Sequence, residues 1–193
     1  MIRPLPAGAN WTAALLDQNG VQPGAKIDVS PSNVPPNGVY PHLTEDLYID
    51  SGGTALVGQG PGIGFGQGAP PTSPTLQDAY ANHVRNNSIW KGAFKGTHVL
   101  AGTQCRSLWG IRVDRKDLRF VEEFDVLRGL LNDGTARYNL PVSSSALKTL
   151  WREGGVASIV RSLPRAGQLH VRVGLARPFD GGKCYMMING VYW

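Results

Sequence analysis

The sequence predicts an α+β fold, in which a small, mainly antiparallel sheet with three to four helices follows a long irregular N-terminal arm. The first observation behind this prediction is composition: residues 1–73 hold 12 of the 25 glycines and 10 of the 14 prolines, a density typical of irregular structure. The second is periodicity, because segments of helical and strand spacing alternate from residue 74 onward. We therefore expect an arm with a Gly-rich linker over 1–73 and a folded domain over 74–193.

The N-terminal segment also carries apolar residues that disordered tails lack. NWTAALLDQNG, residues 10–20, predicts a short helix, and DLYID, residues 46–50, predicts an edge strand. A proline-rich segment with apolar anchors suits an extended path over its own domain or over a neighbouring subunit. The candidate contact residues in this segment are Trp11, Leu15, Leu16, Tyr40 and Tyr48.

Helical patterns occur at three places after residue 73. SPTLQDAYANHVRNN begins with the capping pattern Thr75-x-x-Asp78. FVEEFDVLRGLLNDG, residues 120–134, has the strongest helical pattern, because its large apolar residues share one face. SSSALKTLW and GVASIVRSLP predict two helical pieces, separated by Gly154 and Gly155 and ended by a proline.

Strand patterns fill the rest of the domain: FKGTHVLAGTQ, SLWGIRVD, ARYNL, and a final hairpin whose strands flank the turn sequence DGG. In that hairpin, alternation places Val171, Val173 and Leu175 on a core face together with Cys184, Met186, Ile188 and Tyr192. The opposite face carries His170 and Arg172, which we expect to point toward solvent or a partner. Aromatic and arginine side chains favour interfaces, so three further contact candidates are Arg112, Arg172 and Trp193.

Charge divides the chain at the same place as composition. Residues 1–73 have a net charge of −3 and residues 74–193 a net charge of +8. A basic domain attracts acidic partners, including the acidic arm of another copy. The sequence leaves open a weak contact with nucleic acid through the basic region 85–119, where aromatic residues adjoin lysines and arginines. No apolar run reaches the roughly 18 residues that a membrane helix needs, so no membrane partner is expected.

The glycine run GQGPGIGFGQG, residues 58–68, fails the tests for a nucleotide loop. The sequence APPTSP follows it where a phosphate-binding helix would begin, and no lysine occurs between positions 27 and 90. The four histidines are scattered, without the spacing of a metal site. We therefore expect no cofactor and no metal, and interpret the run as a hinge between arm and domain.

A thiol hydrolase is an alternative from a different class. Cys105 beside an arginine could act as nucleophile, with His170 as base. This chain order, a cysteine before a histidine on a later strand, resembles papain-like and peptidoglycan hydrolases at those two positions alone. The resemblance implies a peptidase or peptidoglycan amidase activity.

The leading hypothesis is a non-enzymatic structural protein of a multi-subunit particle. By analogy of layout, it resembles minor components of bacteriophage virions: head decoration, neck, or tail and baseplate proteins. Its expected partners are further copies and other structural proteins, and its expected location is the virion if a phage encodes it and otherwise the cytoplasm. The alternatives are the Cys-His hydrolase and a nonspecific nucleic-acid-binding protein.

Overall fold

Strands dominate the computed structural model of the chain. The residues that it describes fall into five segments: 3–6, 25–31, 46–59, 72–86 and 96–193. The chain divides into two compact units, Met1–Ala69 and Pro70–Trp193. Among the described residues only one helix is longer than a single turn, so the predicted α+β fold with three to four helices is wrong.

The first unit contains a three-stranded sheet. Its strands are, in spatial order, β1 (Arg3–Pro6), β3 (Asp46–Gln59) and β2 (Ala25–Pro31). β3 pairs in parallel with β1 and antiparallel with β2, so DLYID begins a central strand instead of the predicted edge strand. Where it is described, the N-terminal segment is therefore sheet, which corrects the long irregular arm that the sequence predicts. The predicted helix over 10–20 and the glycines beyond Gln59 lie outside the described residues.

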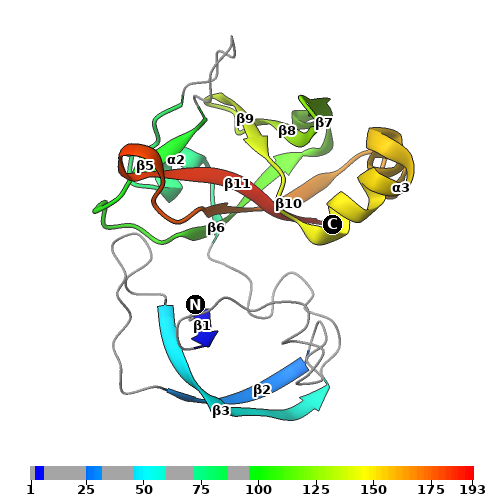
Figure 1. The fold of residues 1–193 in the computed structure, drawn as a ribbon. Coiled ribbons are helices and arrows are strands. Elements are labelled where there is room, and N and C mark those ends of the chain that lie inside the picture. Colours follow the sequence, from blue (N-terminus) through cyan, green and yellow to red (C-terminus); the bar gives the residue numbers. More distant parts are fainter. Residues whose placement is uncertain (1–2, 7–24, 32–45, 60–71, 87–95) are drawn as a thin grey trace. The chain divides into compact units, whose positions relative to one another are not determined.

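A five-stranded sheet forms the centre of the second unit (Figure 1). Its strands are, in spatial order, β4 (Thr72–Ser73), β6 (Leu108–Asp114), β10 (Gln168–Leu175), β11 (Lys183–Tyr192) and β5 (His98–Leu100). β4 runs parallel to β6, and the other pairs are antiparallel. The strands predicted in FKGTHVLAGTQ and SLWGIRVD and the final hairpin are confirmed.

A second sheet stands on one side of the first in Figure 1 and consists of β7 (Leu118–Glu123), β8 (Val126–Asn132) and β9 (Arg137–Pro141). All its pairs are antiparallel, and the short 3-10 helix η1 (Arg115–Asp117) connects β6 to β7. β9 confirms the strand predicted in ARYNL. The helix predicted over 120–134 is wrong, because this stretch forms the β7–β8 hairpin.

That error has a specific cause in the sequence. The helical pattern depends on the spacing of Phe120, Phe124, Leu127 and Leu131. A two-residue turn after Glu123 instead brings three of them to one side of a hairpin. Phe120, Leu127 and Leu131 are buried in the core, whereas Phe124 lies in the turn and is 83% exposed. The alternation of buried and exposed residues along β7 is therefore the pattern that decides the structure.

The helices of the second unit are α2 (Leu76–Ala79) and α3 (Ser145–Ser162). Thr75 caps α2 through its hydroxyl, which accepts a hydrogen bond from the Asp78 amide, as the capping pattern predicts. α3 consists of two helical pieces joined at the non-helical residues Gly154 and Gly155, also as predicted, and it packs against β7 and β8.

One hydrophobic core joins the two sheets of the second unit. β10 and β11 turn through the 3-10 segment η2 (Asp180–Gly182), and both strands bury alternate residues on the predicted core face. A β-bulge between Arg172 and Val173 shifts the register of the hairpin. As a result Val191 packs against the core and Tyr192 lies on the opposite face. This reverses the faces that the sequence predicts for these two residues.

Candidate functional site

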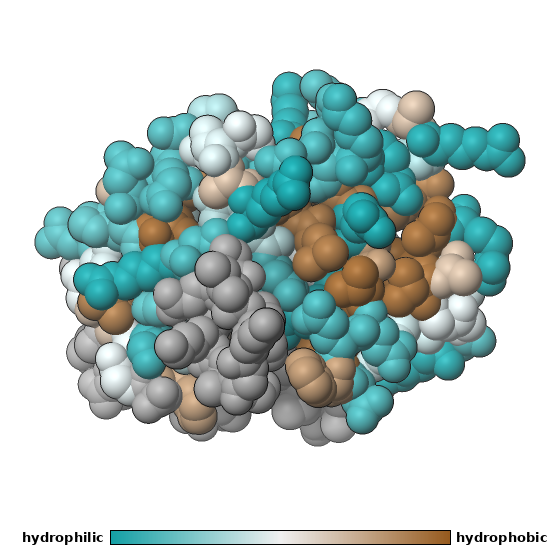
Figure 2. Space-filling view, turned by 90° about the horizontal axis from the view of Figure 1, so that it is seen from above, coloured by the Kyte–Doolittle hydropathy of each residue, from teal (hydrophilic) through white to brown (hydrophobic). Residues whose placement is uncertain are grey.

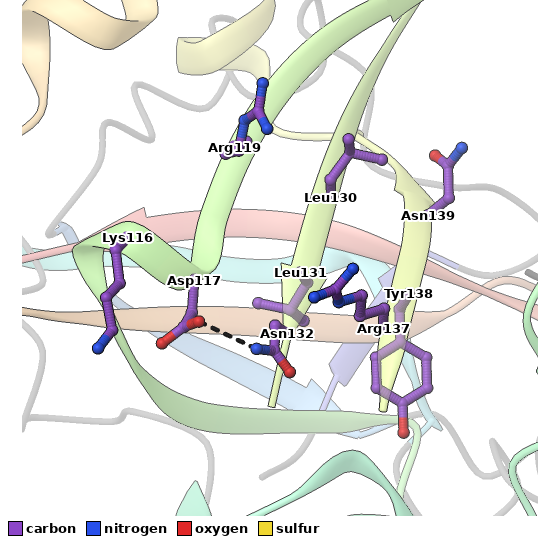
Figure 3. A pocket seen from close by; sticks show the side chains of 9 residues that line it. All are labelled: Lys116, Asp117, Arg119, Leu130, Leu131, Asn132, Arg137, Tyr138 and Asn139. Atoms are coloured by element: carbon purple, nitrogen blue, oxygen red, sulfur yellow. Dashed lines mark hydrogen bonds between the residues drawn. The ribbon is translucent and has the colours of Figure 1, made fainter. Parts of the chain in front are cut away.

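The outer face of the β7–β8–β9 sheet carries a pocket of about 410 Å³ (Figure 3). Arg119, Leu130 and Asn139 are register neighbours on the three strands, and their side chains stand side by side on this face. Residues opposite one another in a sheet share a face, so strand pairing itself assembles this row. The pocket is lined by Lys116, Asp117, Arg119, Leu130, Leu131, Asn132, Arg137, Tyr138 and Asn139.

Hydrogen bonds hold the polar side chains of the pocket in place. Asn132 donates from Nδ2 to Asp117 Oδ1 at 3.0 Å. Asn139 accepts at Oδ1 from Arg128 Nε at 2.6 Å and donates from Nδ2 to Glu123 Oε2 at 3.0 Å. Arg128 is only 4% exposed, and its ion pair with Glu123 (Nε to Oε2, 3.4 Å) satisfies a charge that would otherwise be costly to bury.

The rim of the pocket is basic. Lys116, Arg119 and Arg137 are all exposed at the rim, whereas the acidic Asp117 is engaged by an amide. The ion pair between Lys116 and Asp114 spans 3.8 Å between highly exposed groups, so it contributes little. The apolar floor supplied by Leu130, with cations around it, suits an acidic segment that also carries an apolar side chain.

A second pocket, of about 530 Å³, adjoins the first and shares Lys116 with it. Arg115 and Arg165 add two further cations to its lining. The Arg115 guanidinium donates to the carbonyl oxygens of Pro164 at 3.2 Å and Leu118 at 2.9 Å, which fixes its position. The two pockets together form a basic surface over η1 and its neighbours.

The predicted contact residues Arg112 and Arg172 lie together on the outer face of the five-stranded sheet. Arg112, His170 and Tyr192 are cross-strand neighbours on β6, β10 and β11. Arg172 lies over the Tyr192 ring at 5.5 Å and donates to the carbonyl of Asn189 at 3.3 Å. Burial and, secondarily, the positive charge of Arg112 lower the pKa of His170, so its imidazole favours the neutral form.

Cys105 and His170 lie near opposite ends of the paired stretch of β6 and β10. The Leu175 amide donates to the carbonyl of Ser107, and Leu175 lies five residues along β10 from His170, a separation of about 16 Å. The two residues from Ser107 back to Cys105 span at most about 7 Å of that distance. His170 pairs with Arg112, whereas Cys105 precedes Leu108, which pairs with Gly174 near the other end of β10. Strand pairing therefore does not itself place the two side chains in contact, and the hydrolase alternative stays a prediction.

Of the other predicted contact residues, one lies in the second unit and the rest lie in the N-terminal segment. Trp193 is described and is 64% exposed. Tyr48 lies in β3, and nothing is described of its side chain. The remaining arm candidates lie outside the described residues: Trp11, Leu15, Leu16 and Tyr40. Part of the basic region 85–119 is likewise outside them, over residues 87–95.

Sequence reasoning missed the pocket because it took β7 and β8 for a helix. Arg119 was part of the predicted basic region, but Arg137, Asn132 and Asn139 join it only through strand pairing. The signal that could have found them is the alternation of apolar and polar residues in LRFVEE and RYNLP.

Within the described segments, no three His, Cys, Asp or Glu side chains gather as a metal site would require. The same segments contain no helix of the length and apolarity that crossing a membrane demands. Comparison with known proteins found no match for the chain among family models, curated proteins or solved structures.

Proposed function

We propose that the protein is a structural component of a multi-subunit particle, in which it contacts further copies of itself and other structural proteins. The bacteriophage virion, in its head-decoration, neck or tail and baseplate parts, is the setting that the sequence favours. The first unit would dock on neighbouring subunits, since its segment is acidic and the remainder of the chain is basic.

The observation that supports this proposal is the exposure of aromatic side chains at turns of the second unit. Phe124, in the β7–β8 turn, is 83% exposed, and Phe179, next to the β10–β11 turn, is 72% exposed. Turns usually carry glycine or polar residues, whereas protein interfaces are enriched in aromatic ones. Figure 2 also shows apolar surface gathered in one area of the face that bears β7, β8 and β9 in Figure 1.

Sedimentation velocity over a range of protein concentrations tests the proposal. We expect species larger than the monomer, and we expect Phe124→Ser or Phe179→Ser to shift the distribution toward monomer. Ala157→Ser, an exposed change on α3, is the matched control and should leave the distribution unchanged. A wild-type chain that stays monomeric at every concentration would overturn self-assembly.

Nucleic-acid binding is a second candidate, because five cations surround the two adjoining pockets. Positive side chains would neutralise phosphates and release counterions on binding. Fluorescence anisotropy with labelled single- and double-stranded DNA, repeated at rising salt, measures this. Binding that weakens steeply with salt would support it, and no binding at low salt would exclude it.

A further inference from the structure

The two-residue turn between β7 and β8 has an unusual backbone. Both Phe124 and Asp125 have positive φ angles, 51° and 57°. Turns of this type favour Asn-Gly, because a positive φ is unfavourable for residues with a large side chain. Here a phenylalanine occupies the first position and exposes 83% of its surface. Backbone strain that holds an aromatic ring in solvent is a sign of a functional contact.

Phe124 is followed by an exposed carboxylate, Asp125. The two preceding acidic residues have partners within the chain: Glu122 accepts a hydrogen bond from Trp151, and Glu123 pairs with Arg128. We define Phe124 and Asp125 as the acidic tip. Its composition complements the pocket on the same sheet, which offers an apolar floor at Leu130 and a basic rim.

The acidic tip cannot reach the pocket of its own chain. The turn follows Glu123, which is four residues along β7 from Arg119, a separation of about 13 Å on a paired strand. The rigid ladder of β7 and β8 keeps the two features apart. Any contact between them therefore joins two copies.

We propose that the acidic tip of one copy inserts into the pocket of the next, an inference that depends on the self-assembly proposed above. Phe124 would cover Leu130, and the Asp125 carboxylate would pair with Arg119 and Arg137. A pocket of about 410 Å³ lies within the size range of sites that hold a drug-sized group, so it can admit one aromatic ring with its neighbouring carboxylate.

This contact is heterologous, because it joins two different surfaces of identical chains. A bound pair still presents one unfilled tip and one unfilled pocket. Contacts of this kind generate closed rings or open filaments, depending on the rotation between neighbours. Because the tip is acidic and the rim of the pocket is basic, charge favours pairing of a tip with a pocket over pairing of two tips or two pockets.

Two variants separate the surfaces. The double variant Phe124→Asn with Asp125→Gly removes the acidic tip and gives the turn its preferred residues. The double variant Arg119→Glu with Arg137→Glu reverses the rim, and both arginines are exposed. As a control with the same change of charge, Arg152→Glu with Arg161→Glu alters exposed positions on α3. Circular dichroism checks that each variant is folded.

The decisive experiment mixes the two variants. Each alone should be monomeric where the wild type and the control associate, with the dissociation constant of tip and pocket weakened at least about 30-fold. Mixed together, they should form a one-to-one dimer and nothing larger, because only one intact tip and one intact pocket remain. Sedimentation velocity resolves these species.

Three results would overturn the inference. If the wild type associates and either variant keeps its size, the assembly proposal stands and this contact is wrong. If the mixed variants stay monomeric, the surfaces do not pair with each other. If the rim variant loses DNA binding but still assembles, the pocket is a nucleic-acid site. A monomeric wild type would instead overturn the self-assembly proposal itself.

Discussion

Asp133 ties the turn between β8 and β9 to the first turn of α2. Its Oδ2 accepts a hydrogen bond from the Leu76 amide at 2.8 Å, across 57 residues of chain. Its Oδ1 accepts from the Thr135 amide, the Thr135 hydroxyl and the Ala136 amide at 2.8 to 3.0 Å. Asp133→Asn keeps one carbonyl oxygen for the turn but puts an N–H donor in place of the acceptor that faces Leu76.

The expected cost follows from that lost bond. A hydrogen bond to a charged group contributes about 1.5–3 kcal/mol, and the carboxylate is partly exposed, so we expect Asp133→Asn to lower the free energy of unfolding by about 2 kcal/mol. For a unit of this size, that lowers Tm by roughly 6–12 °C. Thermal unfolding followed by circular dichroism measures it. Asp117→Asn is the control: the structure shows a single hydrogen bond to that carboxylate, from Asn132, so this change should cost less.

The pH dependence provides a second check on Asp133. Burial acts to raise the pKa of its carboxyl, but the hydrogen bonds from Leu76, Thr135 and Ala136 outweigh burial and lower it. A lowered folded-state pKa means that the stabilisation is complete above the unfolded value of about 3.9 and is lost as pH falls through the folded value. The difference between wild type and Asp133→Asn should therefore shrink below about pH 4. A difference that stays constant from pH 7 to pH 2.5 would refute the reasoning.

Three further predictions concern the packing and the charges of the second unit. Gly129→Ala should cost about 1–3 kcal/mol in urea unfolding, because its Cβ would overlap the Ile188 side chain, and Ile188→Val should recover part of this. Arg128→Ala should cost about 3 kcal/mol in the same assay by leaving a partly buried acidic partner without its cation, and a cost below 1 kcal/mol would contradict that role. Arg112→Gln should raise the pKa of His170 in an NMR titration, since burial and the Arg112 charge lower it, and an unchanged pKa would exclude the charge effect.

Local signals in the sequence were sufficient where one short pattern decided the structure. The capping pattern at Thr75 specified where α2 begins, and the pair of glycines specified the break in α3. The DGG turn specified the β10–β11 hairpin, and alternation identified the core face of β10. Each of these features depends on residues within a few positions of one another, so neighbouring residues carry the information.

Features that depend on pairing between distant segments were not predictable in this way. The bulge between Arg172 and Val173 moves Tyr192 to the outer face. No residue near the bulge indicates it in the sequence. The pocket requires β7, β8 and β9 to be in register, and one wrong helix removes that sheet from the prediction altogether. Strand order likewise follows from global packing, which no short pattern contains.

Phe124 and Asp125 make the β7–β8 hairpin hard to predict from the sequence, and they also form its proposed contact surface. An Asn-Gly pair at positions 124 and 125 would have identified the turn at once, and it would also have relieved the positive φ angles. Phe124 and Asp125 instead extend a helical pattern in the sequence and present an aromatic ring and a carboxylate in the structure. Selection for folding alone favours turn residues that suit the backbone, so their absence at an exposed tip favours selection for binding. If Phe124→Asn with Asp125→Gly raises the Tm of the second unit while abolishing assembly, stability and association conflict at this turn. If it lowers the Tm, the turn is not strained, and this argument for a functional tip fails.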